Sequence, residues 1–236
     1  MLKDKILNKE AGIVLYGMTP PKENTDITLI KEIASKHVDR IKRLDIDGVV
    51  LYDIQDESAR NNEVRPFPFL PTFEPQKYSG DFLAGLDLPK VLFQVVGKHS
   101  EGSLKNWMQN NVNNGDLGVF IGNSSSSQSS QVSLEKAYSL RKEFASEMLV
   151  GGVAIPERHF AKKDEHLRIA SKIKNGASYF TTQAVYNIEA SKNMLSDYYY
   201  YSTSNNLPLV PIMMTFSPCG SKKTMEFMKW LGIHFP

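Results

Sequence analysis

The sequence has little cysteine, little net charge and no long apolar run. Its 236 residues include a single cysteine, Cys219, so no disulfide can form within the chain, as is typical of proteins in a reducing compartment. The formal net charge of +2 gives no support for binding to nucleic acid or to a membrane surface. No apolar run reaches the roughly 18 residues needed to span a bilayer, and the N-terminal Met-Leu-Lys-Asp-Lys lacks the apolar core of a signal peptide. We therefore expect a cytoplasmic protein that uses neither nucleic acid nor membrane.

Short apolar runs alternate with segments of helical periodicity along the whole chain. The runs that we predict to be strands are Ile13–Met18, Gly48–Tyr52, Lys90–Val96, Leu117–Gly122, Leu149–Ile155, Tyr179–Val185 and Leu207–Phe216. The segments that we predict to be helices are Ile27–Leu44, Leu134–Met148, Lys163–Lys174, Glu189–Ser204 and Ser221–Leu231. Nearly continuous apolar strands that alternate with helices indicate a parallel sheet buried on both faces.

This alternation predicts an α/β fold of the TIM-type (β/α)8 barrel class, formed by residues 1–236 as a single domain. Seven strand–helix units are visible, and the eighth is missing before the chain stops at Pro236. We expect a shortened version of a longer barrel, although a miscount by one unit would give the same pattern. An incomplete barrel exposes strand edges, so we also expect a homo-oligomer.

Two stretches interrupt the alternation. The prolines of Arg65–Pro71 remove backbone donors and fix φ, which predicts a long loop after the second strand. Ser124–Ser130 contains six serines and one glutamine. It is either a solvated loop or a hydroxyl-rich rim that contacts a phosphate or a ribose.

Polar side chains gather after the fifth and sixth predicted strands, in Gly151–His159 and in Thr181-Thr182-Gln183, with Lys172 on the helix between them. A parallel barrel carries its chemistry on the loops at the carboxyl ends of its strands. This stretch resembles the methylenetetrahydrofolate reductase family, which has a Pro-Glu-x-His followed by a Thr-Gln. The resemblance implies that His159 and Lys172 contact the phosphates of FAD, and that Glu157 and Gln183 contact a pterin substrate.

Each of these residues also has a purely structural interpretation. Glu157 can pair with Arg158, His159 can be an ordinary loop residue and Lys172 can be solvated. The resemblance favours the site, because the polar residues recur at successive strand ends.

The first half of the chain departs from the family pattern. In Tyr16–Pro21 the family has a glutamate as its general acid, and this chain has Gly17, which has no proton to give. Loss of a general acid typically costs about 10²–10⁴ in rate. Asp53, which follows the second strand, is a candidate for a substitute acid or a substrate contact. Its alternative is a helix cap paired with Arg60 or Arg65.

The third and fourth strands depart as well. Gln94 stands where the family usually has a histidine beside the flavin, and Gly122-Asn123 stands where it has Arg-Gly-Asp. The resemblance implies that Gln94, Gly122 and Asn123 lie against the cofactor. Asn123 keeps the hydrogen-bonding capacity of the aspartate but not its charge.

The sequence therefore supports two functions and one inactive alternative. The main interpretation is an FAD-dependent oxidoreductase that acts on a folate-like one-carbon substrate, with Asp53 and Gln183 in catalysis. The alternative is a flavin-free protein that binds folate or another pterin, as a carrier or a methyl-transfer component. The third is an inactive, truncated homologue.

Overall fold

The computed structural model describes residues 1–58, 63–123 and 131–235. The chain divides into two compact units, of which unit 1 comprises Met1–Asp56 and Phe69–Val150 and unit 2 comprises Glu57–Pro68 and Gly151–Pro236. The predicted serine-rich segment Ser124–Ser130 lies outside the described residues, and so does Arg60.

Unit 1 is built on four parallel strands in chain order: β1 (Leu15–Met18), β2 (Gly48–Leu51), β3 (Lys90–Val95) and β4 (Leu117–Ile121). The side chains of β2 are all buried, and β3 and β4 are almost entirely so. Such runs are what a parallel sheet covered on both faces requires. Because all four strands point the same way, their carboxyl ends lie at one edge of the sheet.

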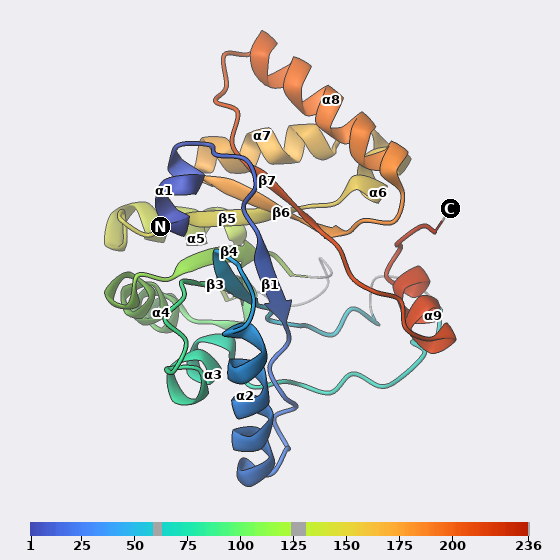
Figure 1. Ribbon diagram of the computed structural model, residues 1–236. Helices are drawn as coiled ribbons and strands as arrows, with labels where there is room; N and C mark the ends of the chain where they lie inside the picture. The colour runs from blue at the N-terminus through green and yellow to red at the C-terminus, as the bar shows by residue number, and fades with distance from the viewer. Residues whose placement is uncertain (59–62, 124–130, 236) are drawn as a thin grey trace. The chain divides into compact units, whose positions relative to one another are not determined.

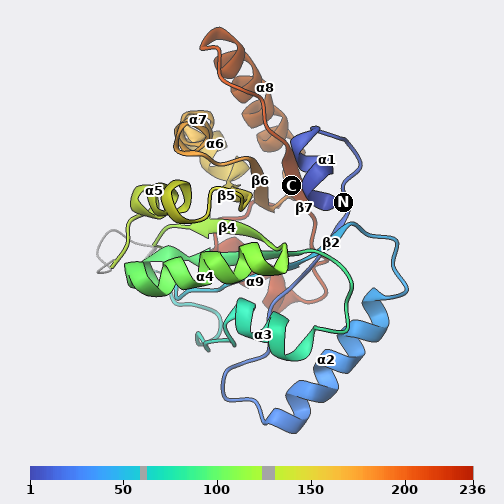
Figure 2. The same ribbon diagram turned by 90° about the vertical axis from the view of Figure 1, so that its left-hand side faces the viewer.

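The helices of unit 1 are α1 (Leu2–Leu7), α2 (Ile27–Ile41), α3 (Pro75–Phe82), α4 (Glu101–Asn114) and α5 (Leu134–Phe144), with a 3₁₀ turn, η2 (Val96–Lys98), directly after β3. Side chains cap the first turns of α2 to α5, since Asp26, Glu74, Ser100 and Ser133 accept hydrogen bonds from backbone N–H groups that would otherwise lack partners. Helices α4 and α5 pack against each other (Figure 2).

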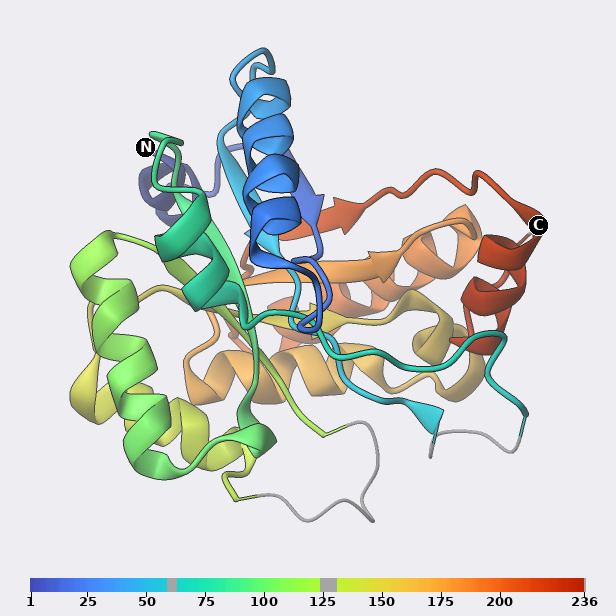
Figure 3. The same ribbon diagram turned by 90° about the horizontal axis from the view of Figure 1, so that it is seen from below.

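Unit 2 contains the parallel strands β5 (Val150–Ala154, whose first residue belongs to unit 1), β6 (Tyr179–Ala184) and β7 (Ile212–Thr215). Its helices are α6 (Pro156–Lys162), α7 (Glu165–Asn175), α8 (Ile188–Ser204) and α9 (Lys222–Trp230). Helix α8 packs against both α6 and α7 (Figure 1). Residues 63–68 run beside α9, where Trp230 donates to the carbonyl oxygen of Glu63 and the ring of Phe67 packs at a tilt against that of Phe227 (Figure 3).

The seven strands are parallel and follow one another in the order of the chain, so the predicted TIM-type α/β fold is confirmed. All seven predicted strands are present, each slightly shorter than the apolar run that predicted it. The largest difference is β7, predicted over Leu207–Phe216 but beginning only at Ile212. Pro208 and Pro211 explain the delay, because proline cannot donate to a strand ladder.

The predicted helices are present as well, but α1, α3, α4 and α6 were not predicted. Helix α6 includes the Pro-Glu-Arg-His stretch that we expected to be a loop. Pro156 begins this helix, a position that suits proline because the first N–H groups of a helix have no partner within it. In the part of the chain that the structure describes, no helix is both long and apolar enough to cross a membrane.

Candidate functional site

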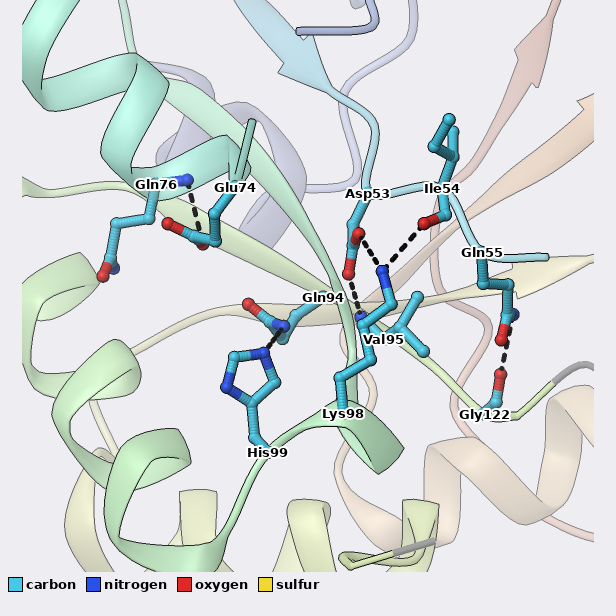
Figure 4. Close-up of polar contacts among 10 residues, drawn as sticks. All are labelled: Asp53, Ile54, Gln55, Glu74, Gln76, Gln94, Val95, Lys98, His99 and Gly122. Atoms are coloured by element: carbon cyan, nitrogen blue, oxygen red, sulfur yellow. Dashed lines mark hydrogen bonds and ion pairs between the residues drawn. The ribbon is translucent and has the colours of Figure 1, made fainter. Parts of the chain in front are cut away.

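The carboxyl ends of β2 and β3 are joined by an ion pair in unit 1 (Figure 4). The carboxylate of Asp53 accepts the backbone N–H of Val95 at 2.8 Å and the ammonium of Lys98 at 2.6 Å. Lys98 also donates to the carbonyl oxygen of Ile54 at 2.7 Å. The Asp53 side chain is 8% exposed and that of Lys98 is 43% exposed. In this arrangement Asp53 is a positioned hydrogen-bond acceptor that holds η2 against the end of β2.

Gln94, in β3, is fully buried, and its amide nitrogen contacts Nε2 of His99 (Figure 4). Burial lowers the pKa of His99, which favours the neutral ring, and a neutral ring can accept at Nε2. Its other nitrogen, Nδ1, then carries the proton and lies 3.4 Å from the Ser103 hydroxyl. The Oε1 of Gln94 has no hydrogen-bond partner among the described residues. It is therefore a buried acceptor available to a ligand donor.

The end of β4 lies at the same edge. Gln55 donates to the carbonyl oxygen of Gly122 at 3.1 Å (Figure 4), and Asn123 is the next residue along the chain. Unit 1 thus brings four of the predicted site residues, Asp53, Gln94, Gly122 and Asn123, to the carboxyl ends of neighbouring parallel strands. Sequence reasoning left Lys98 and His99 out of the site, although their position directly after β3 was the signal that could have included them.

In unit 2, Glu157 lies in the first turn of α6, just beyond the end of β5. It is 5% exposed, and neither carboxylate oxygen has a hydrogen-bond partner among the described residues. Burial raises the pKa of Glu157, while the proximity of its own backbone N–H and then of His234 opposes this rise. Arg158, the structural partner that the sequence suggested for Glu157, binds Glu165 instead, at 2.8 Å. Glu157 is therefore a buried carboxyl group with free acceptor capacity.

His159 points away from the strand end and into the helical layer. It is fully buried, and its Nε2 lies 2.9 Å from Oδ2 of Asp197 on α8. The ring of His166, at the start of α7, packs edge-on against that of His159 at 5.3 Å between centroids. The contacts of His159 are thus to α7 and α8.

Lys172 and Gln183 both bind backbone carbonyl groups within unit 2. The ammonium of Lys172 donates to the carbonyl oxygen of Val153 at 2.6 Å and lies 5.9 Å from the centre of the Phe180 ring. Burial lowers the pKa of Lys172 to about 8. The amide of Gln183 donates to the carbonyl oxygen of Leu231 at 3.3 Å, which leaves its own carbonyl oxygen as an acceptor at the end of β6.

Comparison with solved structures gives a close match over the whole chain. No family model matches the chain, and no curated protein does. Among solved structures, the chain is 49% identical to an uncharacterised protein from Clostridium thermocellum that binds two copies of 5-methyl-5,6,7,8-tetrahydrofolic acid. The match covers 100% of this chain and 76% of that chain, with a TM-score of 0.86.

More distant structures share the fold alone. A 2,3-dimethylmalate lyase of the PEP mutase/isocitrate lyase superfamily is 10% identical, with a TM-score of 0.53 over 99% of this chain and 78% of that chain. An oxaloacetate acetylhydrolase is also 10% identical, with a TM-score of 0.53 over 98% of this chain and 76% of that chain.

Proposed function

Because the chain belongs to the same family as the methyltetrahydrofolate-binding protein of Clostridium thermocellum, we propose that it binds a reduced folate without a flavin, as a folate carrier or a component of a methyl-transfer system. The identity of 49% over the whole chain carries this proposal. The relative binds the folate that already carries the methyl group, which is the product rather than the substrate of a methylene reductase.

The chemistry of the pterin ring fits the polar groups of both units. The 2-amino group and the adjacent ring N–H of a pterin are neighbouring donors, and the ring carbonyl is an acceptor. A carboxylate with two free oxygens accepts from both donors, and Glu157 offers such a group in unit 2. In unit 1, the free Oε1 of the buried Gln94 accepts a single donor. We propose Gln94 and Glu157 as the pterin contacts of two separate centres, one in each unit.

The remaining predicted site residues take supporting roles in this proposal. Asp53 fixes Lys98, whose half-exposed ammonium is suited to the carboxylates of the folate glutamate tail. Gly122 and Asn123 form the neighbouring strand end, and Gln183 offers its carbonyl oxygen at the end of β6, the strand that pairs with β5.

Calorimetric titration of the full chain with 5-methyltetrahydrofolate tests this function. We expect saturable binding by the unmodified protein. Gln94→Leu and Glu157→Gln should each weaken binding at one centre by about 10- to 100-fold, the scale of a lost buried hydrogen bond to a ligand. Gln109→Leu and Glu189→Gln are matched controls, because both residues lie exposed on helices of the same units.

Two results would count against the proposal. Absence of saturable binding at millimolar folate would overturn the function itself. Equal weakening in the site variants and their controls would overturn the assignment of Gln94 and Glu157 while leaving folate binding in place.

The second candidate is the FAD-dependent reduction of a folate, as in the methylenetetrahydrofolate reductases that the sequence resembles. One observation favours it: Glu157 is a buried carboxyl whose pKa is raised, a property of general acids. The visible absorption of the protein after incubation with FAD and removal of excess cofactor separates the candidates. Folate binding without a flavin spectrum supports the carrier, and a flavin spectrum with reduction of methylenetetrahydrofolate supports the reductase.

A further inference from the structure

Three side chains of metal-binding type converge from three helices of unit 2. His159 comes from α6, His166 from α7 and Asp197 from α8, the helix that packs against both others (Figure 1). Each residue offers one ligand atom, and these atoms all lie within 4.8 Å of one another. Asp197 is far from the two histidines in the sequence, and the packing of α8 against α6 and α7 brings it to them.

The polar atoms of this cluster are only partly satisfied by their neighbours. The hydrogen bond between His159 and Asp197, 2.9 Å long, accounts for one ring nitrogen. Nδ1 of His159 and Nδ1 of His166 are both buried, and neither has a hydrogen-bond partner among the described residues. Buried polar atoms without partners are costly. A simple histidine–aspartate pair does not account for two such atoms in adjacent imidazole rings.

We propose that His159, His166 and Asp197 form a site for a divalent transition metal of the zinc type. Two imidazoles and one carboxylate are a ligand set that Zn²⁺ prefers, with water completing a four-coordinate site. The Asp197 side chain is 50% exposed, so the cluster can be reached by the ion and its water. This proposal is independent of folate binding, because it uses neither Gln94 nor Glu157.

The reach of the side chains agrees with a metal. Ligands of tetrahedral zinc lie roughly 3.3 Å apart, given metal–ligand bonds of about 2.0–2.1 Å. The three ligand atoms lie within 4.8 Å of one another, and side-chain rotations of His166 and Asp197 would bring them to the shorter separation that zinc requires. His159, fully enclosed, provides the fixed ligand.

Cobalt binding to the tag-free full chain, after removal of metals with a chelator, is a direct test. We expect one Co²⁺ per chain, visible d–d absorption of a four- or five-coordinate ion, and displacement by one equivalent of Zn²⁺. Ligands from imidazole and carboxylate give no sulfur-to-cobalt charge-transfer band. This distinguishes the cluster from adventitious binding to Cys219, the exposed free thiol.

The variants His166→Ala and Asp197→Asn should each weaken Zn²⁺ binding by at least about 10- to 100-fold, the range seen even for residues that only support metal ligands. His37→Ala is the matched control, since it removes an imidazole of unit 1 and should leave binding unchanged. The melting temperature of each metal-free variant checks its fold.

A folded native chain that binds no Co²⁺ or Zn²⁺ with micromolar affinity would overturn the proposal and leave a structural histidine–aspartate pair. The proposal is also overturned if both ligand variants bind the metal as tightly as the native chain.

Discussion

The ring of Tyr52 fills the space that a side chain at position 17 would need. A Cβ atom built on Gly17 would lie 2.7 Å from the Tyr52 hydroxyl oxygen and 2.9 Å from a ring carbon. Tyr52 in turn packs edge-on against Phe93, with ring centroids 4.8 Å apart. The glycine at position 17 and the tyrosine at position 52 are therefore linked by packing in unit 1.

This contact predicts that Gly17→Ala destabilises the protein by about 1–3 kcal/mol, the usual cost of overpacking, since the Tyr52 ring must leave its contact with Phe93. Urea unfolding of Gly17→Ala, Tyr52→Ala and the double variant measures the coupling. We expect Gly17→Ala to cost little once Tyr52 is alanine. Additive costs in the double variant would show that the two positions do not compete for space.

The Asp53–Lys98 pair predicts an unequal response to the loss of its two members. Asp53→Ala leaves the Val95 N–H without its acceptor and should cost about 1–3 kcal/mol. Lys98→Ala removes a half-exposed ammonium and should cost less than about 1 kcal/mol. Asp53→Asn keeps a side-chain oxygen that can accept the N–H of Val95. The unfolding free energy of this variant, measured in urea, should therefore lie between those of Asp53→Ala and Lys98→Ala. A larger loss for Lys98→Ala than for Asp53→Ala would contradict this order.

The strands were predictable because a strand buried on both faces is a nearly continuous apolar run. Such a run can be recognised in the sequence without knowing which elements pack against it. Helix α4 was not, because Glu101–Asn114 is rich in asparagine and buries only Leu104, Trp107, Met108 and Asn111. Its start is nevertheless encoded in Ser100, which accepts the Ser103 N–H at 3.2 Å. In α4 the helix signal thus lies more in the cap than in the apolar periodicity.

The polar residues at the strand ends could be located from the sequence because the apolar strands before them could be located. The side chains that these residues contact could not be predicted. Asp53 could be placed after β2 from the sequence, while its pairing with Lys98 depends on the register of β2 and β3 and on the turn η2. The link from His159 to Asp197 was beyond reach, because it requires the packing of α6 against α8 and because Asp197 directly precedes a run of tyrosines that gives the stronger signal in α8. Contacts between elements carry information that periodicity does not.

The buried carboxyl of Glu157 predicts a distinct dependence of stability on pH. Burial raises its pKa in the folded state, whereas in the unfolded chain a glutamate titrates near about 4.3. Between these two values the folded state binds more protons, so the contribution of Glu157 to stability is fully present below about pH 4.3 and is lost as pH rises through the folded pKa.

Glu157→Gln has no such loss. The unfolding free energy of this variant minus that of the native chain should therefore increase from about pH 4 to about pH 7, as measured by urea unfolding across that range. Glu189→Gln, an exposed substitution on α8, should show a nearly constant difference over the same range. A difference for Glu157→Gln that stays flat would contradict the raised pKa, because it would mean that folding leaves the pKa of Glu157 unchanged. A difference that falls as pH rises would mean that the carboxylate of Glu157 is stabilised in the folded protein.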